Sequence, residues 1–103
     1  MRYYSTNHNS PSVSFKEALL RGLAPDRGLY LPEKIPVFSS KVLSSLEEMP
    51  YHEVAFLVLR EFLKDEVPED ILRKMTQEAY NFLVPIQEVT GNTYLLRLDQ
   101  GPT

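Results

Sequence analysis

The apolar residues that follow Pro50 recur at helical spacing. They occupy positions i, i+3, i+4 and i+8 of the chain: Val54, Leu57, Val58 and Phe62. This spacing places the four side chains on one face of an α-helix. The pattern therefore predicts a helix that begins at Tyr51, directly after a proline, and that turns this face toward the core.

A second long helix is predicted after the polar break at Lys64–Asp65–Glu66. Pro68 suits the first turn of a helix, and the acids Glu69–Asp70 suit the positive end of its dipole. The expected core face comprises Ile71, Met75, Ala79 and then Phe82 or Leu83. Because proline cannot continue a helix, we expect this one to run until Pro85.

Two shorter helices are marked by their caps. Ser14 stands three residues before Glu17, the spacing at which each side chain accepts the other's free backbone N–H, and Val13 is placed to pack on Ala18. We expect this helix at 15–21, with Gly22 in a left-handed conformation after its end. A serine at 39 or 40 predicts a second short helix through Glu48.

The remaining segments are extended. Strands are expected at 2–6 and 29–31, and extended chain at 34–37 before and around prolines. A hairpin is expected from 86–89 and 94–98, with Gly91–Asn92 in a type II′ turn. The predicted fold class is α+β: a short N-terminal strand, a helical middle and a C-terminal β-hairpin, in one domain over 1–103.

Length and composition narrow the functional classes. The chain has 103 residues, 43% apolar and 24% charged, which is typical of one small globular domain. Its net charge of −3 argues against a nucleic-acid partner. It has no cysteine, no signal peptide and no membrane-spanning run, so we expect a cytoplasmic protein without a membrane partner.

No residue pattern predicts an active site or a metal site. His8 and His52 belong to no metal-binding motif, and each is interpreted as a structural or surface histidine. The adjacent acids suit helix starts or polar breaks better than catalysis: Glu47–Glu48, Asp65–Glu66 and Glu69–Asp70. The N-terminal serines lack a nucleophile-elbow motif, and the four aromatics most suited to stacking are interpreted as core: Tyr3, Tyr4, Tyr30 and Tyr94.

Three stretches in order along the chain resemble threonine synthases. The start at 2–7 is similar to the family's opening. The run from Val13 to Pro32 resembles its N-terminal block, in which a capped helix precedes Gly-Leu-Ala-x-Asp-Gly-Gly-Leu-Tyr-x-Pro. Residues 98–103 resemble the approach to its Gly-Pro-Thr-x-x-Phe-Lys-Asp motif.

The resemblance implies a parent enzyme of the tryptophan-synthase-β-like fold. Such an enzyme uses pyridoxal 5′-phosphate (PLP) to convert O-phospho-L-homoserine and water to L-threonine and phosphate. The lysine that holds the cofactor follows Gly-Pro-Thr by a few residues in the family, so it is expected beyond Thr103. Residues 98–103 would then lead into a catalytic PLP domain that is absent here.

For the site residues, the resemblance implies no catalytic residue within this chain. The lysines present do not match the motif: Lys16, Lys34, Lys41, Lys64 and Lys74. Thr103 alone is a candidate cofactor-binding residue, because it flanks the expected lysine. We therefore expect the chain alone to be inactive and to bind no PLP, with the missing catalytic domains as its partner and a small-molecule substrate in the parent.

Two departures from the family pattern stand out. Arg27 occupies a position where the family usually has glycine, and we expect the turn to adopt a form without a left-handed residue there. Asp99–Gln100 stand where the family often has an aromatic residue and a histidine. Two alternatives remain open at this stage: a threonine-synthase-like phospho-lyase, and a self-standing interaction module. The terminal hairpin is the expected place for an exposed apolar face that favours self-association.

Overall fold

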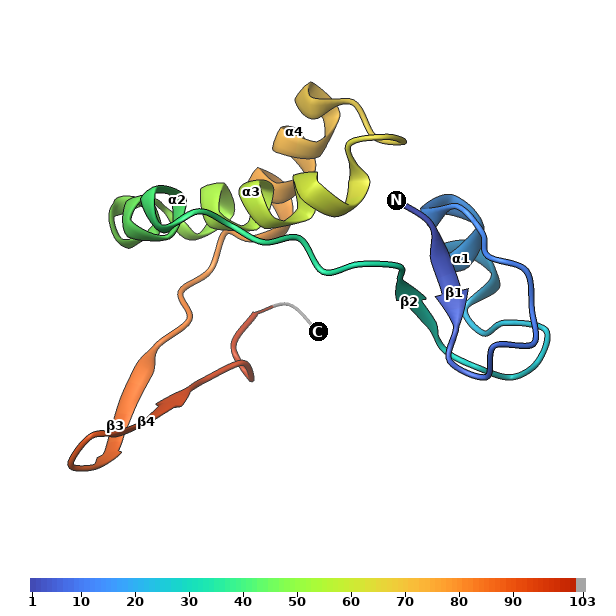
Figure 1. Ribbon diagram of the computed structural model, residues 1–103. Helices are drawn as coiled ribbons and strands as arrows, with labels where there is room; N and C mark the ends of the chain where they lie inside the picture. Colours follow the sequence, from blue (N-terminus) through green and yellow to red (C-terminus); the bar gives the residue numbers. More distant parts are fainter. Residues whose placement is uncertain (102–103) are drawn as a thin grey trace.

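Residues 1–101 are described by a computed structural model, and Pro102 and Thr103 lie outside the described residues. The described elements occur in this order: β1 (Tyr3–Ser5), α1 (Phe15–Arg21), β2 (Tyr30–Pro32), α2 (Ser40–Ser45), the 3₁₀ helix η1 (Leu46–Glu48), α3 (Tyr51–Leu63), α4 (Glu69–Ala79), β3 (Ile86–Thr90) and β4 (Thr93–Leu96). The α+β class is confirmed. Figure 1 shows three parts: β1, α1 and β2 on one side, α2 to α4 in the middle, and the hairpin of β3 and β4 projecting below.

The first part, which we call the N-terminal unit, is a two-stranded antiparallel sheet covered by α1. Tyr3 pairs with Pro32 and Ser5 with Tyr30. The backbone of Tyr3 also exchanges two hydrogen bonds of 2.9 Å with Val13. Tyr3, Val13 and Ala18 form its small buried core, so the expected contact of Val13 with α1 is confirmed.

The ends of α1 are capped as the sequence predicts, with one difference. The Ser14 hydroxyl accepts the Glu17 N–H, and Gly22 follows the helix with φ 75°. Glu17, however, does not cap in return: its carboxylate lies 2.6 Å from the Arg21 guanidinium. A more distant acid caps the first turn instead: the two carboxylate oxygens of Glu66 accept from the N–H groups of Phe15 at 2.7 Å and Lys16 at 3.2 Å.

The middle part, the helical unit, contains α2, η1, α3 and α4. Ser39 caps α2 by accepting the Val42 N–H at 3.3 Å, and Pro50 and Pro68 precede α3 and α4. Helices α3 and α4 follow one another after a short connection and pack against each other. Phe56, Leu63 and Leu72 form the buried core between them.

The core faces predicted for the two long helices are wrong. On α3 the buried residues are Ala55, Phe56 and Leu63, whereas Val58 is exposed. On α4 they are Leu72 and Thr76, whereas Ile71 and Met75 are about half exposed. Both helices carry apolar residues on more than one face, and periodicity does not decide which face meets a neighbour.

The second long helix also ends earlier than Pro85 would suggest. Helix α4 stops at Ala79, and Tyr80 lies outside the helical region with φ −108° and ψ 55°. The chain leaves the helix because two aromatic rings pack on Tyr51 at the start of α3. The Tyr80 and Phe82 rings stand edge-on to the Tyr51 ring at centroid distances of 5.2 and 5.8 Å.

The N-terminal and helical units meet at one junction. Phe15 of α1 packs against the cores of both units, and its backbone N–H is bonded to Glu66. The Tyr3 hydroxyl donates to the Phe62 carbonyl at 3.3 Å, and the Tyr3 and Phe15 rings lie 5.7 Å apart. Burial, with a smaller contribution from the Glu66 charge, raises the pKa of Tyr3, which keeps the phenol protonated as a donor.

The terminal hairpin is present, but its turn differs from the predicted type. All nine residues of β3 and β4 are exposed, as expected for the apolar face. A type II′ turn requires φ > 0 at Gly91, whereas the positive φ of 61° belongs to Asn92. Asparagine tolerates this region better than most side chains, so the turn keeps its length with another geometry.

The turn before β2 departs from the prediction in a second way. Arg27 adopts φ 68°, so the left-handed conformation persists although the residue is not glycine. Gly28 has no left-handed φ, and its role is steric: a Cβ there would lie 2.0 Å from Ser5 Oγ and 2.9 Å from the Asn7 backbone nitrogen. The expectation that the turn avoids strain at Arg27 is therefore wrong.

These parts do not form a compact globule. The Cα radius of gyration is 16.4 Å, compared with about 13 Å for a compact domain of 100 residues. The N-terminal unit and the hairpin extend from the helical unit in different directions, and the connection at 33–39 is extended (Figure 1).

The Glu66 cap should contribute measurably to stability. We expect Glu66→Ala to lower the free energy of unfolding by about 1 kcal/mol, because the two N–H groups at the start of α1 lose their acceptor. Urea denaturation followed by far-UV circular dichroism measures this. Glu78→Ala, at an exposed position of α4, is the matched control and should change stability by less than about 0.5 kcal/mol. Equal effects of the two variants would contradict the cap.

Substitutions at 27 and 28 should have opposite signs. Arg27→Gly removes a left-handed side chain and should raise the free energy of unfolding by about 0.5–1 kcal/mol, after allowance for the added freedom of the unfolded chain. Gly28→Ala introduces a steric overlap with Ser5 and should lower it by about 1–3 kcal/mol. Urea midpoints of both variants test the pair, and a destabilised Arg27→Gly would show that the arginine is not strained.

Candidate functional site

The residue that the resemblance singles out lies outside the described part of the chain. Thr103 is not among residues 1–101, so its cofactor role stays a prediction. The residues that lead to it are described. Asp99 accepts a two-pronged hydrogen bond from the Arg97 guanidinium at 3.1 and 2.6 Å, and this bond holds the pKa of Asp99 below its usual value. Gln100 also donates to Asp99, at 3.4 Å.

Two independent features require glycine at position 101. Its φ of 112° lies in a region open to glycine. A Cβ at this position would also lie 2.8, 2.9 and 3.0 Å from the ring atoms Cζ, Cε2 and Cε1 of Phe82. Gly101 itself thus lies against the Phe82 ring, which packs on Tyr51 at the start of α3.

The described lysines do not fit a covalently bound cofactor. All five are exposed, and Lys64 is paired with Glu61 at 3.0 Å. A lysine that forms an imine with a carbonyl cofactor needs a shielded position where its amine is deprotonated. None of the five lysines in residues 1–101 has that setting, so the chemistry of PLP is assigned to none of them.

The two histidines lie apart from each other and from any shared site. His8 is exposed, has φ 55° and stacks on Tyr4 with ring centroids 5.2 Å apart. His52 is half-buried on α3, and its Nδ1 lies 3.8 Å from Glu53, which is too long for a hydrogen bond. Within residues 1–101 no three His, Asp or Glu side chains are placed to hold a metal. No helix in that part has the length and apolar character needed to span a membrane.

Of the four tyrosines predicted as core, Tyr3 and Tyr30 belong to the core of the N-terminal unit, whereas Tyr4 stacks on the exposed His8 instead. Tyr3 is buried and Tyr4 and Tyr30 are half-buried, whereas Tyr94 is 61% exposed on the hairpin. Its interpretation as a core residue is therefore wrong. The reason is that β4 has the apolar composition of a buried strand but no layer packed on it within this chain.

The densest polar network is centred on Asp26, which sequence reasoning treated only as part of a turn. Its Oδ1 accepts from Ser5 Oγ at 2.6 Å and the Gly28 N–H at 2.9 Å, and its Oδ2 accepts from the Asn9 N–H at 2.9 Å. The Asn7 side chain donates to the Asp26 carbonyl at 2.9 Å. One carboxylate thus joins the chain start to the turn before β2.

This network has a structural role and not a catalytic one. Ser5 is fully buried, so its hydroxyl cannot reach a substrate. The hydrogen bond from Ser5, followed by those from the Gly28 and Asn9 backbones, lowers the pKa of Asp26. The stretches around Ser5 and Asp26 both resemble the family. The hydrogen bond from Ser5 to the Asp26 carboxylate gives a structural reason why a chain that has one stretch also has the other. A signal was present in the sequence, because an aspartate two residues before a glycine is suited to accept a hydrogen bond from the backbone N–H of that glycine.

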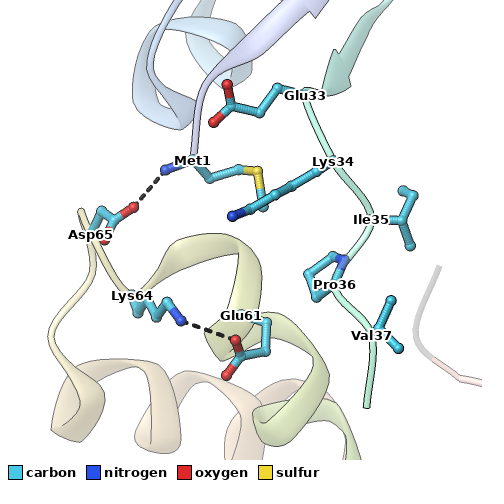
Figure 2. A pocket seen from close by; sticks show the side chains of 9 residues that line it. All are labelled: Met1, Glu33, Lys34, Ile35, Pro36, Val37, Glu61, Lys64 and Asp65. Atoms are coloured by element: carbon cyan, nitrogen blue, oxygen red, sulfur yellow. Dashed lines mark hydrogen bonds and ion pairs between the residues drawn. The ribbon is translucent and has the colours of Figure 1, made fainter.

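A cavity of about 410 Å³ lies between the chain start and the end of α3 (Figure 2). Its lining residues come from three segments: Met1, the run 33–37, and Glu61, Lys64 and Asp65. The Met1 amino group contacts Asp65 at 2.5 Å, and this contact lowers the pKa of the Asp65 carboxyl. The lining carries both acidic and basic side chains, and Lys64 pairs with Glu61 as the Met1 amino group does with Asp65, so the cavity offers no field of one sign for a charged ligand.

The surface instead carries many exposed apolar side chains. Those at least half exposed occur on α1, α2, α4 and the hairpin, and in the segments between α1 and β2, between β2 and α2, after α4 and after β4: Leu19, Leu20, Leu23, Leu29, Ile35, Val37, Leu43, Met75, Leu83, Ile86, Val89, Tyr94, Leu95, Leu96 and Leu98. Two apolar grooves accompany them. One of about 270 Å³ lies between α1 and the α3–α4 pair, and one of about 360 Å³ lies between the start of α3 and the base of the hairpin. Exposure on this scale is typical of an interaction surface.

Comparison with known proteins gives one consistent result. The model of the family described as "Threonine synthase N terminus" matches residues 2–80. Threonine synthases from Pseudomonas aeruginosa and Methylobacillus glycogenes are 38% and 39% identical over the whole of this chain. The chain spans about a quarter of the length of these relatives, 23% and 24%.

Solved structures show the same relationship. The PLP-bound threonine synthase from Brucella melitensis superposes with a TM-score of 0.88 and 37% identity, over 99% of this chain and 23% of that one. The threonine synthase from Escherichia coli superposes with a TM-score of 0.84 and 28% identity, over 95% of this chain. The unusual open arrangement of the three parts is therefore shared with proteins that continue for much longer.

The Asp26 network should give stability a characteristic dependence on pH. Because the folded carboxyl has the lower pKa, ionised Asp26 stabilises the fold above its unfolded value of about 4. That stability is lost as pH falls from there through the lower folded pKa. Asp26→Asn should therefore unfold at lower urea concentration than the unmodified chain at pH 7, with the gap narrowing toward pH 2.5.

Asp70→Asn, on the exposed first turn of α4, provides the same chemical change outside the network. Its urea midpoint should stay near that of the unmodified chain at both pH values. A gap for Asp26→Asn that is constant with pH would mean that ionisation of Asp26 does not stabilise the fold.

Proposed function

Because the chain belongs to the threonine synthase N terminus family, we propose that it serves as the non-catalytic N-terminal domain of a threonine synthase. The parent enzyme converts O-phospho-L-homoserine and water to L-threonine and phosphate. The observation that carries the proposal is that the whole chain matches proteins named threonine synthase in sequence and fold. The match covers about a quarter of the length of each of these proteins. PLP is the parent's proposed cofactor, which is supported by the PLP-bound threonine synthase from Brucella melitensis.

The domain assignment follows from the same comparison. Residues 1–103 form one domain, and 98–103 lead from the hairpin into the catalytic PLP domain. PLP supplies an electron sink for the reacting carbon when it is bound. The five lysines of this chain are exposed, so we assign the cofactor-holding role to none of them, and Thr103 stays the candidate cofactor-binding residue.

The task of the domain is to support the rest of the enzyme. Its exposed leucines, isoleucines and valines form the surface on which the remaining domains of the same polypeptide pack, and the small-molecule substrate binds in the parent. The two apolar grooves beside α1 and beside the hairpin support this assignment. When the domain is isolated, the same surface promotes self-association. The absence of cysteine is consistent with action in the reducing cytoplasm.

One observation favours a second candidate reaction. Asp99 and Gln100 occupy the place where the family often has an aromatic residue and a histidine, and Asp99 is engaged with Arg97. A parent with this change at the approach to the cofactor could be a threonine-synthase-like phospho-lyase. Both candidates use the same cofactor and a phosphorylated substrate, and product identification separates them.

A hybrid enzyme tests the proposed function. It joins this chain to the part of the Brucella melitensis threonine synthase that the match leaves uncovered. We expect the hybrid to release phosphate from O-phospho-L-homoserine and to form threonine, measured by phosphate assay and amino-acid chromatography. The isolated chain should form neither product, and PLP with borohydride should not label one of its lysines stoichiometrically.

The uncovered Brucella part without this chain is the matched control. Equal activity with and without the chain would show that the domain has no supporting role, and phosphate release without threonine would favour the phospho-lyase. Sedimentation of the isolated chain tests self-association, which strictly monomeric behaviour at high concentration would contradict.

A further inference from the structure

We propose that Phe82 is a positioning residue that orients the segment beginning at Gly101. The inference rests on the proposed function, because that segment resembles the family's approach to the cofactor-binding lysine. It goes beyond that function by assigning a role to Phe82, a side chain of the connection between α4 and β3.

The contact between the two residues is a face contact. A Cβ built on Gly101 would lie at nearly equal distances, 2.8–3.0 Å, from three adjacent atoms of the Phe82 ring. A point beyond the ring edge would be much nearer to one atom than to its two neighbours. The near equality therefore places the Gly101 backbone over the ring face, closer than any residue with a side chain could approach.

The Phe82 ring is itself fixed on a rigid element. It stands edge-on to Tyr51, the first residue of α3, and Tyr51 packs on Tyr80 as well. Edge-to-face pairs of this kind favour one orientation over others. Tyr51 and Phe82 also line the groove at the base of the hairpin, together with Leu96 and Leu98. The path of rigid contacts thus runs from α3 through two rings to Gly101.

The base of the hairpin brings the segment to this ring. The Arg97 N–H donates to the Pro85 carbonyl at 3.0 Å, so the two ends of the hairpin stay together. After Arg97, the chain turns back from the hairpin toward the helical unit, which Figure 1 shows as the return of the terminal segment below α3. The ion pair of Arg97 with Asp99 and the hydrogen bond from Gln100 to Asp99 are local and exposed. Among the described residues, the contact of Gly101 with the Phe82 ring and the groove that Leu98 lines connect this segment to the start of α3.

The ring contact gives a direct spectroscopic signature in the isolated chain. A proton over an aromatic face is shielded, so an Hα of Gly101 should resonate upfield of its random-coil position in NMR spectra. Phe82→Leu should abolish this shift, whereas Phe82→Tyr should retain it. Leu83→Ala, at a neighbouring side chain that is 86% exposed, is the control and should leave the shift unchanged. An unshifted Gly101 in the unmodified chain would overturn the proposal.

The role in positioning is tested in the hybrid enzyme. Phe82→Leu should lower kcat roughly tenfold or more with KM within about twofold, since misplacement affects the reacting geometry rather than substrate binding. Phe82→Tyr should restore most of the activity. Gly101→Ala alters the other partner of the contact. Its effect on kcat should therefore be smaller in the Phe82→Leu background than in the unmodified hybrid. It also replaces Phe82→Leu as the test if that variant does not fold.

The outcomes separate this inference from the proposed function. An inactive unmodified hybrid would contradict the proposed function, and the NMR shift then decides whether Phe82 orients Gly101. An active hybrid in which Phe82→Leu leaves kcat unchanged would overturn the positioning role while the proposed function stands. Loss of the shift together with loss of kcat supports both.

Discussion

The fold depends on one junction, where Glu66 caps a helix that lies fifty residues earlier in the chain. Helix α1 has seven residues, too few to be stable alone. Its start is held by the Glu66 carboxylate, and its first side chain, Phe15, belongs to the cores of both units. The N-terminal unit has only Tyr3, Val13 and Ala18 in its own core. It is therefore an extension of the helical unit rather than an independent layer.

Local signals in the sequence predicted most elements, because those signals act within a few residues. Ser14, Ser39 and Pro50 mark their helix starts correctly, and Gly22 has the left-handed conformation expected after α1. The errors concern contacts between distant segments. The face of α4 that carries Leu72 is buried because α3 lies there, and the helix ends at Ala79 because aromatic rings meet Tyr51. Neither neighbour is visible in the local pattern.

The candidate site divides in the same way. The sequence showed that the last residues resemble the family's segment before the cofactor-binding lysine. It did not show that the Phe82 ring lies against Gly101, since nineteen positions separate the two residues. The Asp26 network was overlooked because its donors Ser5 and Asn9 lie in another segment. Arg27 shows the converse: its network neighbours hold the turn in the left-handed form despite the unfavourable side chain.

The distant origin of the Glu66 cap also has a consequence for the order of events during synthesis. A ribosome releases α1 long before residue 66, so the helix emerges without its acceptor and without the core that receives Phe15. The α3–α4 pair has its own buried core and short connection, and it can fold as soon as it is released. The native cap and packing of α1 therefore cannot form until residue 66 has left the ribosome.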